Sequence, residues 1–557
     1  MTFLQMVLLV TGLVGAALAD FELVVIHTND MHARLDEIAA GGGSCGKSSK
    51  CYGGFARIKA AADQVRATRK NVIFLNAGDS FQGSPYYSVY KWEVIAQFVD
   101  MLGIDVMSLG NHEFDDGVSG LAPYLRTIKT PTVVCNINYD KEPALLGTNF
   151  HRWYSLKVDG THIAVVGYLT PDTMFLSKTD KVFIMDEVES IRKAASEARA
   201  AGAKIVIAVG HSGFDMDRKI AQEVENIDVV VGGHTNTFLY TGDAPDIEVP
   251  ASVYPHMETQ ASGKKVPVVQ AFAWTKYLGV LNLKFNDKYQ LVSASGNPIL
   301  MDSTKPKDPK VSAKLDYWKN LLNSRTAMHV GTTTVDLDGN CRNKECNLGN
   351  MVADALYEYG QVAAAGNKWP KIPLVLYNGG GVRSSILLNS TGGSLTMGDI
   401  LTSFPFENQL RVVSLTGKAL KEAIEVGVAE YDPAGVILKG SFLMMSGIRV
   451  VYDLRKPPGS RIRSLKVICS ECPNKEYRDI NMDETYLVIL PSFLADGGDG
   501  FTVLKEKAEH VAFIDDSDTQ VISDYVKRHG TVSPVLDGRI KFLSSRRGND
   551  ASFRMKG

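Results

Sequence analysis

Residues 21–32 read FELVVIHTNDMH, an apolar run that ends in polar side chains able to bind a metal. The β-branched run from Phe21 to His27 predicts a strand, and Asp30 and His32 follow it at the turn. His27 points back into the strand, so we expect it to lie in the core or behind the metal-binding side chains. The same order of strand, polar Gly-rich turn and helix recurs through the first half of the chain.

This repeated pattern predicts the fold class of the first half. Further apolar runs predict strands at Asn71–Leu75, Asp105–Leu109, Thr132–Cys135, Ile163–Gly167, Lys204–Val209 and Asp228–Val231. The stretch from Phe55 to Arg69 carries an apolar stripe that is typical of a helix. Continuously apolar strands that alternate with helices indicate a layered α/β domain whose sheet is covered on both faces.

Other strand ends carry the same kinds of side chain as the first turn. These side chains are Asp79, Asn111, His112, His211, His234 and Asn236. Open α/β sheets bind their ligands at the carboxyl ends of the strands, so we expect these side chains to converge. Each of them alone is better explained as a cap or as a buried polar residue, but five separate turns share this character.

These residue types indicate a particular chemistry. Imidazole and carboxylate together favour zinc, manganese or iron over calcium, which prefers sites made only of oxygen. The candidates are too many for one tetrahedral ion and suit two ions that share a bridging carboxylate, which can clamp a phosphoryl group. His112 and Asp115 are three residues apart, so on one helical turn Asp115 can orient the imidazole.

The composition restricts the class of protein. The chain has 557 residues, more than one ordinary core accommodates, so two large domains are expected. Its 45% hydrophobic and 22% charged residues are typical of globular proteins. A formal net charge of -2 lacks the basic character of proteins that bind nucleic acid polymers, so we expect no such partner.

The chain is predicted to have five parts. Residues 1–19 are expected to form a signal peptide and residues 20–304 the first α/β domain. A linker at residues 305–329, with a helix from Ser312 to Asn323, precedes a second α/β domain at residues 330–545 and a polar tail at residues 546–557.

Both ends of the chain predict export. An apolar stretch followed by Ala17-Leu18-Ala19 matches a cleaved signal peptide, with an uncleaved membrane anchor as the alternative. From Ser544 onward the chain is polar and basic and lacks a GPI-anchor signal. We therefore expect a secreted protein without a membrane anchor, and the sequence leaves its oligomeric state open.

The cysteines agree with an oxidising compartment. Six of the seven fall into close pairs, Cys45 with Cys51, Cys341 with Cys346, and Cys469 with Cys472. These pairs predict three short disulfides, with a redox or zinc-binding role for the last pair as the alternative. Cys135 lies in an apolar run and is expected to be a buried free thiol. Asn389-Ser390-Thr391 is a glycosylation sequon in a loop-like setting.

The motifs around the predicted ligands resemble the 5'-nucleotidase family of calcineurin-like metallophosphoesterases, and within it animal ecto-5'-nucleotidases and secreted salivary apyrases of blood-feeding arthropods. The matching segments are His27–His32, Asn76–Ser80, Gly110–Asp115, Gly210–Ser212 and Gly233–Asn236. The resemblance implies a catalytic dyad of His112 and Asp115 and two divalent ions, zinc being expected and calcium or another metal the alternative. One ion would be held by Asp30, His32, Asp79 and Asn236, and the other by Asp79, Asn111, His211 and His234.

The resemblance also implies that the second domain binds the nucleoside. Its substrate-binding residues would be Arg342, Asn378, Arg383, Phe406, Phe493 and Asp499. Two aromatic rings can stack on the faces of a purine, a carboxylate can accept from a ribose diol, and arginines fit phosphate oxygens. Met444 stands where glutamine is usual in the family.

Together these features predict a secreted two-metal enzyme that releases phosphate from extracellular nucleotides. Its expected substrates are ATP, ADP and AMP, as for an apyrase, and lowering ATP and ADP outside cells would inhibit platelet aggregation. One alternative is a 5'-nucleotidase restricted to AMP that produces adenosine. The other is a secreted binding protein without turnover.

Overall fold

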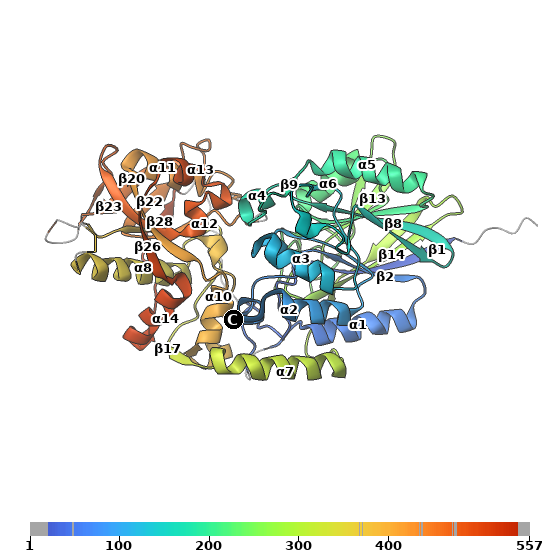
Figure 1. Ribbon diagram of the computed structural model, residues 1–557, viewed down its shortest axis with the longest axis horizontal. Coiled ribbons are helices and arrows are strands. Elements are labelled where there is room, and N and C mark those ends of the chain that lie inside the picture. Colours follow the sequence, from blue (N-terminus) through green and yellow to red (C-terminus); the bar gives the residue numbers. More distant parts are fainter. Residues whose placement is uncertain are drawn as a thin grey trace, which may run out of the picture.

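The computed structural model describes residues 20–543 apart from residues 47–49, 367, 370, 434, 436–437, 470–471 and 473–475. Two α/β domains lie side by side, and helix α7 (Pro309–Thr326) runs along the lower edge of the N-terminal domain to the junction with the C-terminal domain (Figure 1). The predicted two-domain architecture is confirmed. The predicted signal peptide and the tail from Ser544 lie outside the described residues, and the exact domain boundaries stay predictions.

Most strands of the N-terminal domain form two large sheets rather than one, beside a small sheet of β5 (Ile137–Asn138) and β9 (Phe183–Ile184). The first has the order β15 (Leu291–Gly296), β14 (Tyr277–Phe285), β1 (Phe21–Thr28), β2 (Val72–Ala77), β3 (Val106–Ser108), β4 (Thr132–Val133) and β6 (Phe150–His151), with β16 (Ile299–Leu300) beside β14. The second has the order β12 (His256–Thr259), β13 (Lys265–Val269), β11 (Val229–Val231), β10 (Ile205–His211), β8 (Thr161–Leu169) and β7 (Trp153–Val158). All seven predicted strands are present, divided between these sheets.

The two sheets pack face to face, and helices cover their outer faces. Val25 of β1 and Ile207 of β10 belong to one buried cluster between the sheets. The outer face of the first sheet is covered by α1 (Phe55–Thr68), α2 (Pro85–Leu102), α3 (Gly117–Thr127) and α7, and that of the second by α5 (Glu187–Ala200) and α6 (Phe214–Glu223). Each sheet is therefore buried on both faces, as its continuously apolar strands predict.

Helix α7 packs on the N-terminal domain along its length. Val311, Leu315, Trp318 and Leu322 form one stripe on the helix, and all four are buried in the core cluster that contains α1 and α2. The helix ends at Thr326, and the first strand of the second domain, β17 (His329–Thr333), begins three residues later. The predicted linker helix is thus part of the N-terminal domain, and the short connection after it joins the two domains.

The C-terminal domain is built around a five-stranded sheet. Its order is β21 (Leu443–Ser446), β18 (Leu374–Asn378), β25 (Thr485–Pro491), β20 (Gln409–Thr416) and β26 (Glu509–Ser517). A second sheet contains β24 (Tyr477–Asp479), β23 (Ile462–Ile468), β22 (Ile448–Tyr452) and β28 (Ile540–Phe542), and a third contains β19 (Ser394–Thr396), β17 and β27 (Thr531–Val532). The helices that pack on these sheets are α8 (Asn347–Ala365), α10 (Met397–Ser403), α11 (Gly417–Val426), α13 (Thr502–Lys507) and α14 (Asp518–His529).

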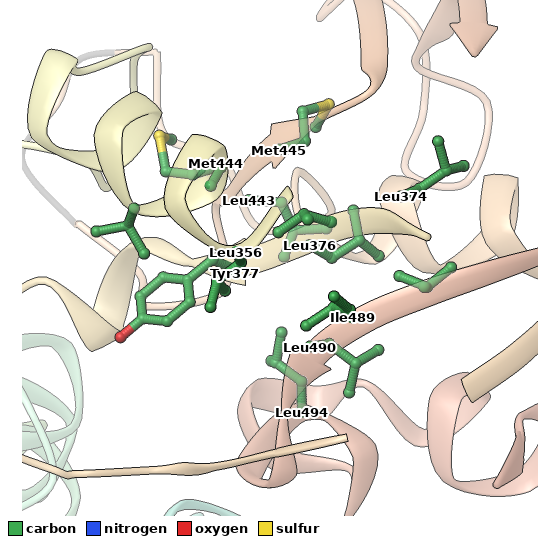
Figure 2. Close-up of a cluster of buried hydrophobic side chains, with 14 of the residues drawn as sticks. Leu356, Leu374, Leu376, Tyr377, Leu443, Met444, Met445, Ile489, Leu490 and Leu494 are labelled. Atoms are coloured by element: carbon green, nitrogen blue, oxygen red, sulfur yellow. The ribbon is translucent and has the colours of Figure 1, made fainter. Parts of the chain in front are cut away.

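The core of this domain lies between α8 and the five-stranded sheet. Leu356 of α8 packs with Leu376 of β18, Leu443 of β21 and Ile489 of β25, and all four side chains are fully or almost fully buried (Figure 2). Strands β18 and β25 run parallel and end close together. This arrangement brings the turns after Asn378 and after Pro491 to the same edge of the sheet.

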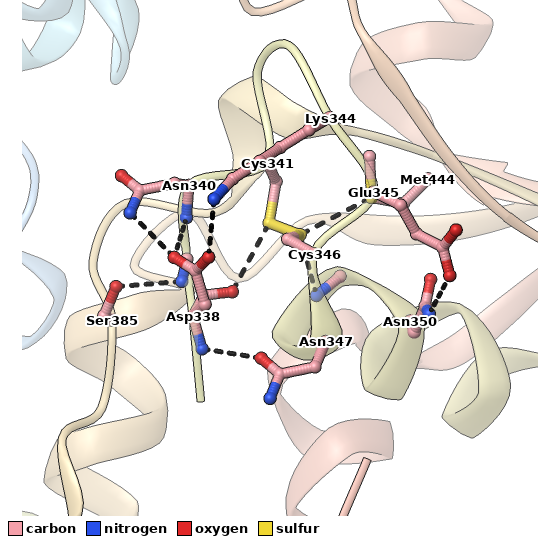
Figure 3. Close-up of a disulfide and its surroundings, with 12 residues drawn as sticks. Asp338, Asn340, Cys341, Lys344, Glu345, Cys346, Asn347, Asn350, Ser385 and Met444 are labelled. Atoms are coloured by element: carbon pink, nitrogen blue, oxygen red, sulfur yellow. Dashed lines mark hydrogen bonds and ion pairs between the residues drawn. A yellow bond between two sulfur atoms is a disulfide. The ribbon is translucent and has the colours of Figure 1, made fainter. Parts of the chain in front are cut away.

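The cysteines pair as predicted. The structure joins Cys45 to Cys51, Cys341 to Cys346, and Cys469 to Cys472, and it buries Cys135 as a free thiol. The second disulfide closes the turn before α8, and Sδ of Met444 lies 3.5 Å from Sγ of Cys346 (Figure 3). Met444 therefore supports this turn from the core.

Two surface features complete the comparison with the sequence. Asn389 is exposed, but it lies in the short helix α9 (Leu388–Thr391) rather than in a loop. Glycosylation of this residue stays a prediction. Within the described part of the chain, no helix combines the length and the apolar character needed to cross a bilayer.

Candidate active site

The predicted metal ligands gather where the two sheets of the N-terminal domain present their carboxyl strand ends. Parallel strands β1, β2 and β3 carry three of the polar turns, and parallel strands β10 and β11 carry the other two. Because the sheets face each other, turns from different sheets meet at one edge. The convergence predicted from the sequence is present in the structure.

Asp79 lies at the centre of the cluster. Its Oδ2 is 3.0 Å from Nε2 of His211, 3.9 Å from Nε2 of His32 and 4.0 Å from Nε2 of His112. Its Oδ1 accepts a hydrogen bond of 3.0 Å from the backbone N–H of His112. One carboxylate oxygen thus faces three imidazoles from three different turns, as expected of a residue shared by two metal sites.

In two neighbouring ligands, one polar atom hydrogen-bonds to the surrounding protein and the other faces the cluster. Oδ2 of Asp30 accepts hydrogen bonds from Asn29 Nδ2 at 2.8 Å and from His234 N at 2.9 Å, whereas the buried Oδ1 has no hydrogen-bond partner. Nδ1 of His211 is 2.7 Å from the Ala77 carbonyl oxygen, and its buried Nε2 faces Oδ2 of Asp79 at 3.0 Å. Second partners of this kind orient a metal-binding side chain toward an ion.

The remaining predicted ligands complete the edge of the site. Nδ1 of His234 is 3.1 Å from Oδ1 of Asn111, and the rings of His211 and His234 have centroids 5.1 Å apart. Oδ1 of Asn236 is buried without a hydrogen-bond partner. Unpaired buried acceptors are costly in a protein, and a cation satisfies them.

The turns approach each other so closely that side chains would not fit. A Cβ on Gly110 would lie 2.1 Å from Oδ1 of Asp79, so glycine is required there. Between these turns, Glu113 accepts backbone hydrogen bonds from Asp79, Ser80, Phe81 and Gly110. Sequence reasoning missed Glu113, although its place inside the Gly110–Asp115 motif was a signal.

The dyad residues are oriented as their spacing predicts. Nδ1 of His112 is 2.7 Å from Oδ2 of Asp115. The other oxygen of Asp115 accepts a hydrogen bond of 2.8 Å from Oγ of Ser177. The imidazole is thus held at one nitrogen, and Nε2 faces the cluster. Ser177 was also missed, and no pattern around it in the sequence could have identified it.

The electrostatics favour positive charge at the centre of the cluster. Burial raises the pKa of the Asp30 carboxyl above its ordinary value. Burial also acts to raise the pKa of Asp79, but the facing His211 and His112 outweigh it and hold that pKa well below the usual range. Burial lowers the pKa of His211, yet Asp79 and Asp30 together raise it above its ordinary value. A cation can take the place of the protons that these pairs share.

The donor set fits two metal ions. Two groups of three, Asp30 with Asp79 and His211, and His32 with Asp79 and His112, have ligand atoms within 4.8 Å of one another and share Asp79. Imidazole, carboxylate and amide donors suit transition metals and zinc. The second group includes His112, so the geometry alone does not separate a ligand role for this residue from the predicted catalytic one.

The C-terminal domain reaches this cluster directly. Nη2 of Arg383 is 3.3 Å from Nε2 of His32, although the two residues are 351 positions apart. The ring of Phe406 lies beside both His112 and Arg383, with its centroid 5.8 Å from that of the His112 ring and 5.6 Å from the Arg383 guanidinium carbon. The residues that the resemblance assigns to phosphate binding and base stacking therefore lie beside the predicted metal ligands.

Hydrogen bonds between the domains support these two residues. Oγ of Ser88 donates to the carbonyl oxygen of Pro405 at 3.0 Å, one residue before Phe406. The backbone N–H of Ser385 donates to the carbonyl oxygen of Gly41 at 3.2 Å, two residues after Arg383.

The other predicted substrate residues lie farther into the C-terminal domain. Nδ2 of Asn378 donates to Oδ2 of Asp499 at 2.7 Å, and Nη1 of Arg342 donates to the Leu438 carbonyl oxygen at 3.2 Å. The ring of Phe493 covers Gly498, where a Cβ would lie 2.4 Å from a ring carbon. No ring contact between Phe493 and Phe406 occurs among the described residues, so a base held between them stays a prediction.

Comparison with known proteins agrees with this geometry. The model of the calcineurin-like phosphoesterase family matches residues 23–238, and that of the 5'-nucleotidase C-terminal domain matches residues 329–506. The chain is 40% identical to the 5'-nucleotidase of Bos taurus over 547 residues, covering 96% of this chain and 93% of that protein. It is also 40% identical to the snake venom 5'-nucleotidase of Naja atra over 529 residues, covering 94% of this chain and 99% of that protein. The chain belongs to the 5'-nucleotidase family.

A solved structure agrees with the fold of this nucleotidase. The 5'-nucleotidase precursor from Thermus thermophilus superposes with a TM-score of 0.86 at 34% identity, covering 94% of this chain and 100% of that chain. The nucleotidase is therefore a metal-dependent hydrolase of nucleotides. Its phosphoesterase fold implies two divalent metal ions, which the shared Asp79 and its neighbours can hold.

Proposed function

We propose that the protein is a secreted enzyme that releases phosphate from extracellular ATP, ADP and AMP. The observation that carries this proposal is the contact between Arg383 of the C-terminal domain and His32 of the metal cluster. A guanidinium beside a pair of cations is suited to a phosphate group that bridges both domains. Removal of ATP and ADP outside cells would inhibit platelet aggregation.

The residues around the cluster have separate tasks in this proposal. When bound, the two ions neutralise charge on a phosphoryl group and supply a nucleophile from water. His112, held by Asp115, donates through Nε2 to the phosphoryl oxygens as charge builds on them. Arg383 binds phosphate oxygens, and Phe406 stacks on the base.

Zinc is the metal that we propose for both sites. Histidine, carboxylate and amide groups are ligands that zinc accepts, and calcium prefers a site made only of oxygen. The ligands proposed for the two ions are those that the resemblance implies, with Asp79 bridging them. The oxygens Oδ1 of Asp30 and Oδ1 of Asn236, which are buried without a hydrogen-bond partner, support this assignment.

Three observations support secretion. The N-terminal sequence predicts a signal peptide. The three disulfides suit an oxidising compartment. A relative at 40% identity is a snake venom protein. We propose that the mature protein is extracellular.

A second candidate function is that of a 5'-nucleotidase restricted to AMP. Relatives that match over nearly the full chain are named 5'-nucleotidases, which favours this candidate. The preference for one, two or three phosphates depends on the space between the metal cluster and Phe406 during turnover. A binding protein without turnover is the third candidate, and the complete set of ligand side chains argues against it.

Phosphate release from AMP, ADP and ATP by the purified protein distinguishes these candidates. We expect release from all three nucleotides, loss of release after treatment with EDTA, and recovery on addition of zinc. Calcium is the matched control for the metal. Release from AMP alone would support the restricted enzyme, and no release with any metal would support the binding protein.

Phe406→Ala is expected to weaken the use of nucleotides selectively. Stacking of a base on an aromatic ring contributes about 1–3 kcal/mol, so KM for AMP should rise between about 5-fold and about 150-fold. The kinetic constants for p-nitrophenyl phosphate, which has no base, should change little.

Phe513→Ala is the matched control for this variant. Phe513 is 54% exposed on strand β26 and should affect neither substrate. Equal losses of Phe406→Ala on AMP and on p-nitrophenyl phosphate would count against the stacking role.

A further inference from the structure

The backbone of the loop at residues 233–237 is strained at two predicted metal ligands. His234 has a φ of 79° and Asn236 has a φ of 52°, a region that residues with a side chain rarely adopt. Such conformations persist only where the surrounding structure holds them in place. The side chain that holds this loop comes from the segment after strand β13 and binds the backbone of the loop rather than its ligand side chains.

That side chain is Gln270, which follows strand β13 and is fully buried. Its Nε2 donates to the carbonyl oxygen of Gly233 at 3.1 Å, and its Oε1 accepts from the backbone N–H of Thr237 at 3.0 Å. The amide thus binds both ends of the ligand loop. Because one partner is a carbonyl and the other an N–H group, only one orientation of the amide satisfies both.

The Gln270 side chain is held in place by two further buried side chains. Its Nε2 also donates to Oδ2 of Asp217 at 2.7 Å, and Oδ1 of that carboxylate accepts from the Tyr168 hydroxyl at 2.6 Å. Asp217 and Tyr168 are both fully buried. The amide therefore cannot turn without breaking buried hydrogen bonds on both sides.

The same segment also holds the first ligand loop. Asn29 Oδ1 accepts from the backbone N–H of Ala271 at 2.8 Å, and Asn29 Nδ2 donates to the Phe272 carbonyl oxygen at 2.6 Å. Asn29 Nδ2 also donates to Oδ2 of Asp30, which leaves Oδ1 of Asp30 free for an ion. Residues 270–272 therefore connect two ligand loops that belong to different sheets.

We propose that Gln270 is a positioning residue for the metal site, which holds His234 and Asn236 at the geometry that binds an ion. It contacts no substrate and no predicted ligand side chain, and it acts through the backbone of residues 233–237. This inference is independent of the nucleotide preference proposed above, because it concerns metal affinity.

The test is Gln270→Glu in the full-length protein. The substitution keeps the shape of the side chain but replaces its two N–H donors by an oxygen that faces the Gly233 carbonyl and Asp217. Zinc affinity, measured by competition with a chelator, is expected to fall about 10- to 100-fold, as for other residues that support metal ligands. The rise in Tm on addition of zinc should shrink accordingly, because that rise reports binding to the folded state.

Gln260→Glu is the matched control. Gln260 is also buried, and its Nε2 donates to the carbonyl oxygens of Ala221 at 2.9 Å and Val224 at 2.8 Å, with no contact to a ligand loop. This variant should lose stability but keep the zinc affinity of the wild type. If Gln270→Glu does not fold, Gln270→Asn retains the amide one methylene shorter and should weaken zinc binding in the same direction.

Two results would overturn the proposal. One is wild-type zinc affinity in a folded Gln270 variant. The other is an equal loss of zinc affinity in Gln260→Glu, since that would reflect general destabilisation. Failure of the protein to hydrolyse nucleotides would contradict the proposed function and leave the zinc measurement unaffected.

Discussion

Asp79→Asn is expected to lower kcat by at least about a hundredfold, because a shared carboxylate stabilises both metal ions and the transition state between them. Asp79 Oδ2 faces His211, His32 and His112 from one position, so no neighbouring carboxylate replaces it. The amide of asparagine keeps the size of the side chain but carries no negative charge. Phosphate release and bound zinc should be measured on the same preparation, and both are expected to fall.

Asp228→Asn is the control for the loss of a buried carboxylate. Asp228 is 5% exposed and accepts a hydrogen bond of 2.8 Å from the backbone N–H of Val206. It directly precedes strand β11, whereas His234 follows the opposite end of that strand. This variant should keep normal turnover. Retention of more than about a tenth of the wild-type rate by Asp79→Asn would contradict a bridging role.

His112→Ala is expected to reduce kcat by about 100- to 1,000-fold with little change in KM, since it removes a donor that acts on the transition state. Asp115 and Ser177 orient this imidazole, so the effect depends on one nitrogen, Nε2. The rate should be measured at saturating zinc. His151→Ala is the control, because His151 is half-buried on β6, the edge strand of the first sheet, and contacts Asn149.

Bound zinc in the His112→Ala variant decides between two roles. The catalytic role predicts two zinc ions for each chain and a low rate. Loss of one ion, with the rate restored by a high zinc concentration, would instead make His112 a ligand, as its distance of 4.0 Å from Asp79 Oδ2 also permits.

The sequence predicted the ligand cluster because its signal is local. Each candidate directly follows a strand, and parallel strands bring their carboxyl ends to one edge. The pattern does not report which strands pair, so the division of β1 and β10 between two sheets could not be foreseen. The apolar stripe on α7 was visible, but its partner in the N-terminal domain was not.

The parts of the site that the sequence did not predict depend on contacts between residues far apart in the chain. Arg383 and His32 are 351 residues apart, and nothing in either segment indicates the other. The role of Arg383 could be expected only from the family resemblance, whereas His32 was expected from its place after the first strand. Ser177 and Gln270 are single polar residues outside any motif, and their importance depends on hydrogen bonds that exist only in the folded chain.

The disulfides have a consequence for the way in which the molecule resists unfolding. Their cysteines are separated by 6, 5 and 3 positions, and each pair lies within one domain. Cross-links this short remove little freedom from the unfolded chain, about 2 kcal/mol each in the loop-entropy model. The disulfides therefore stabilise three local turns, and the arrangement of the two domains depends on the connection after α7 and on non-covalent contacts. In the oxidising compartment proposed for this enzyme, these cross-links would protect single turns against local unfolding and would not restrain one domain relative to the other.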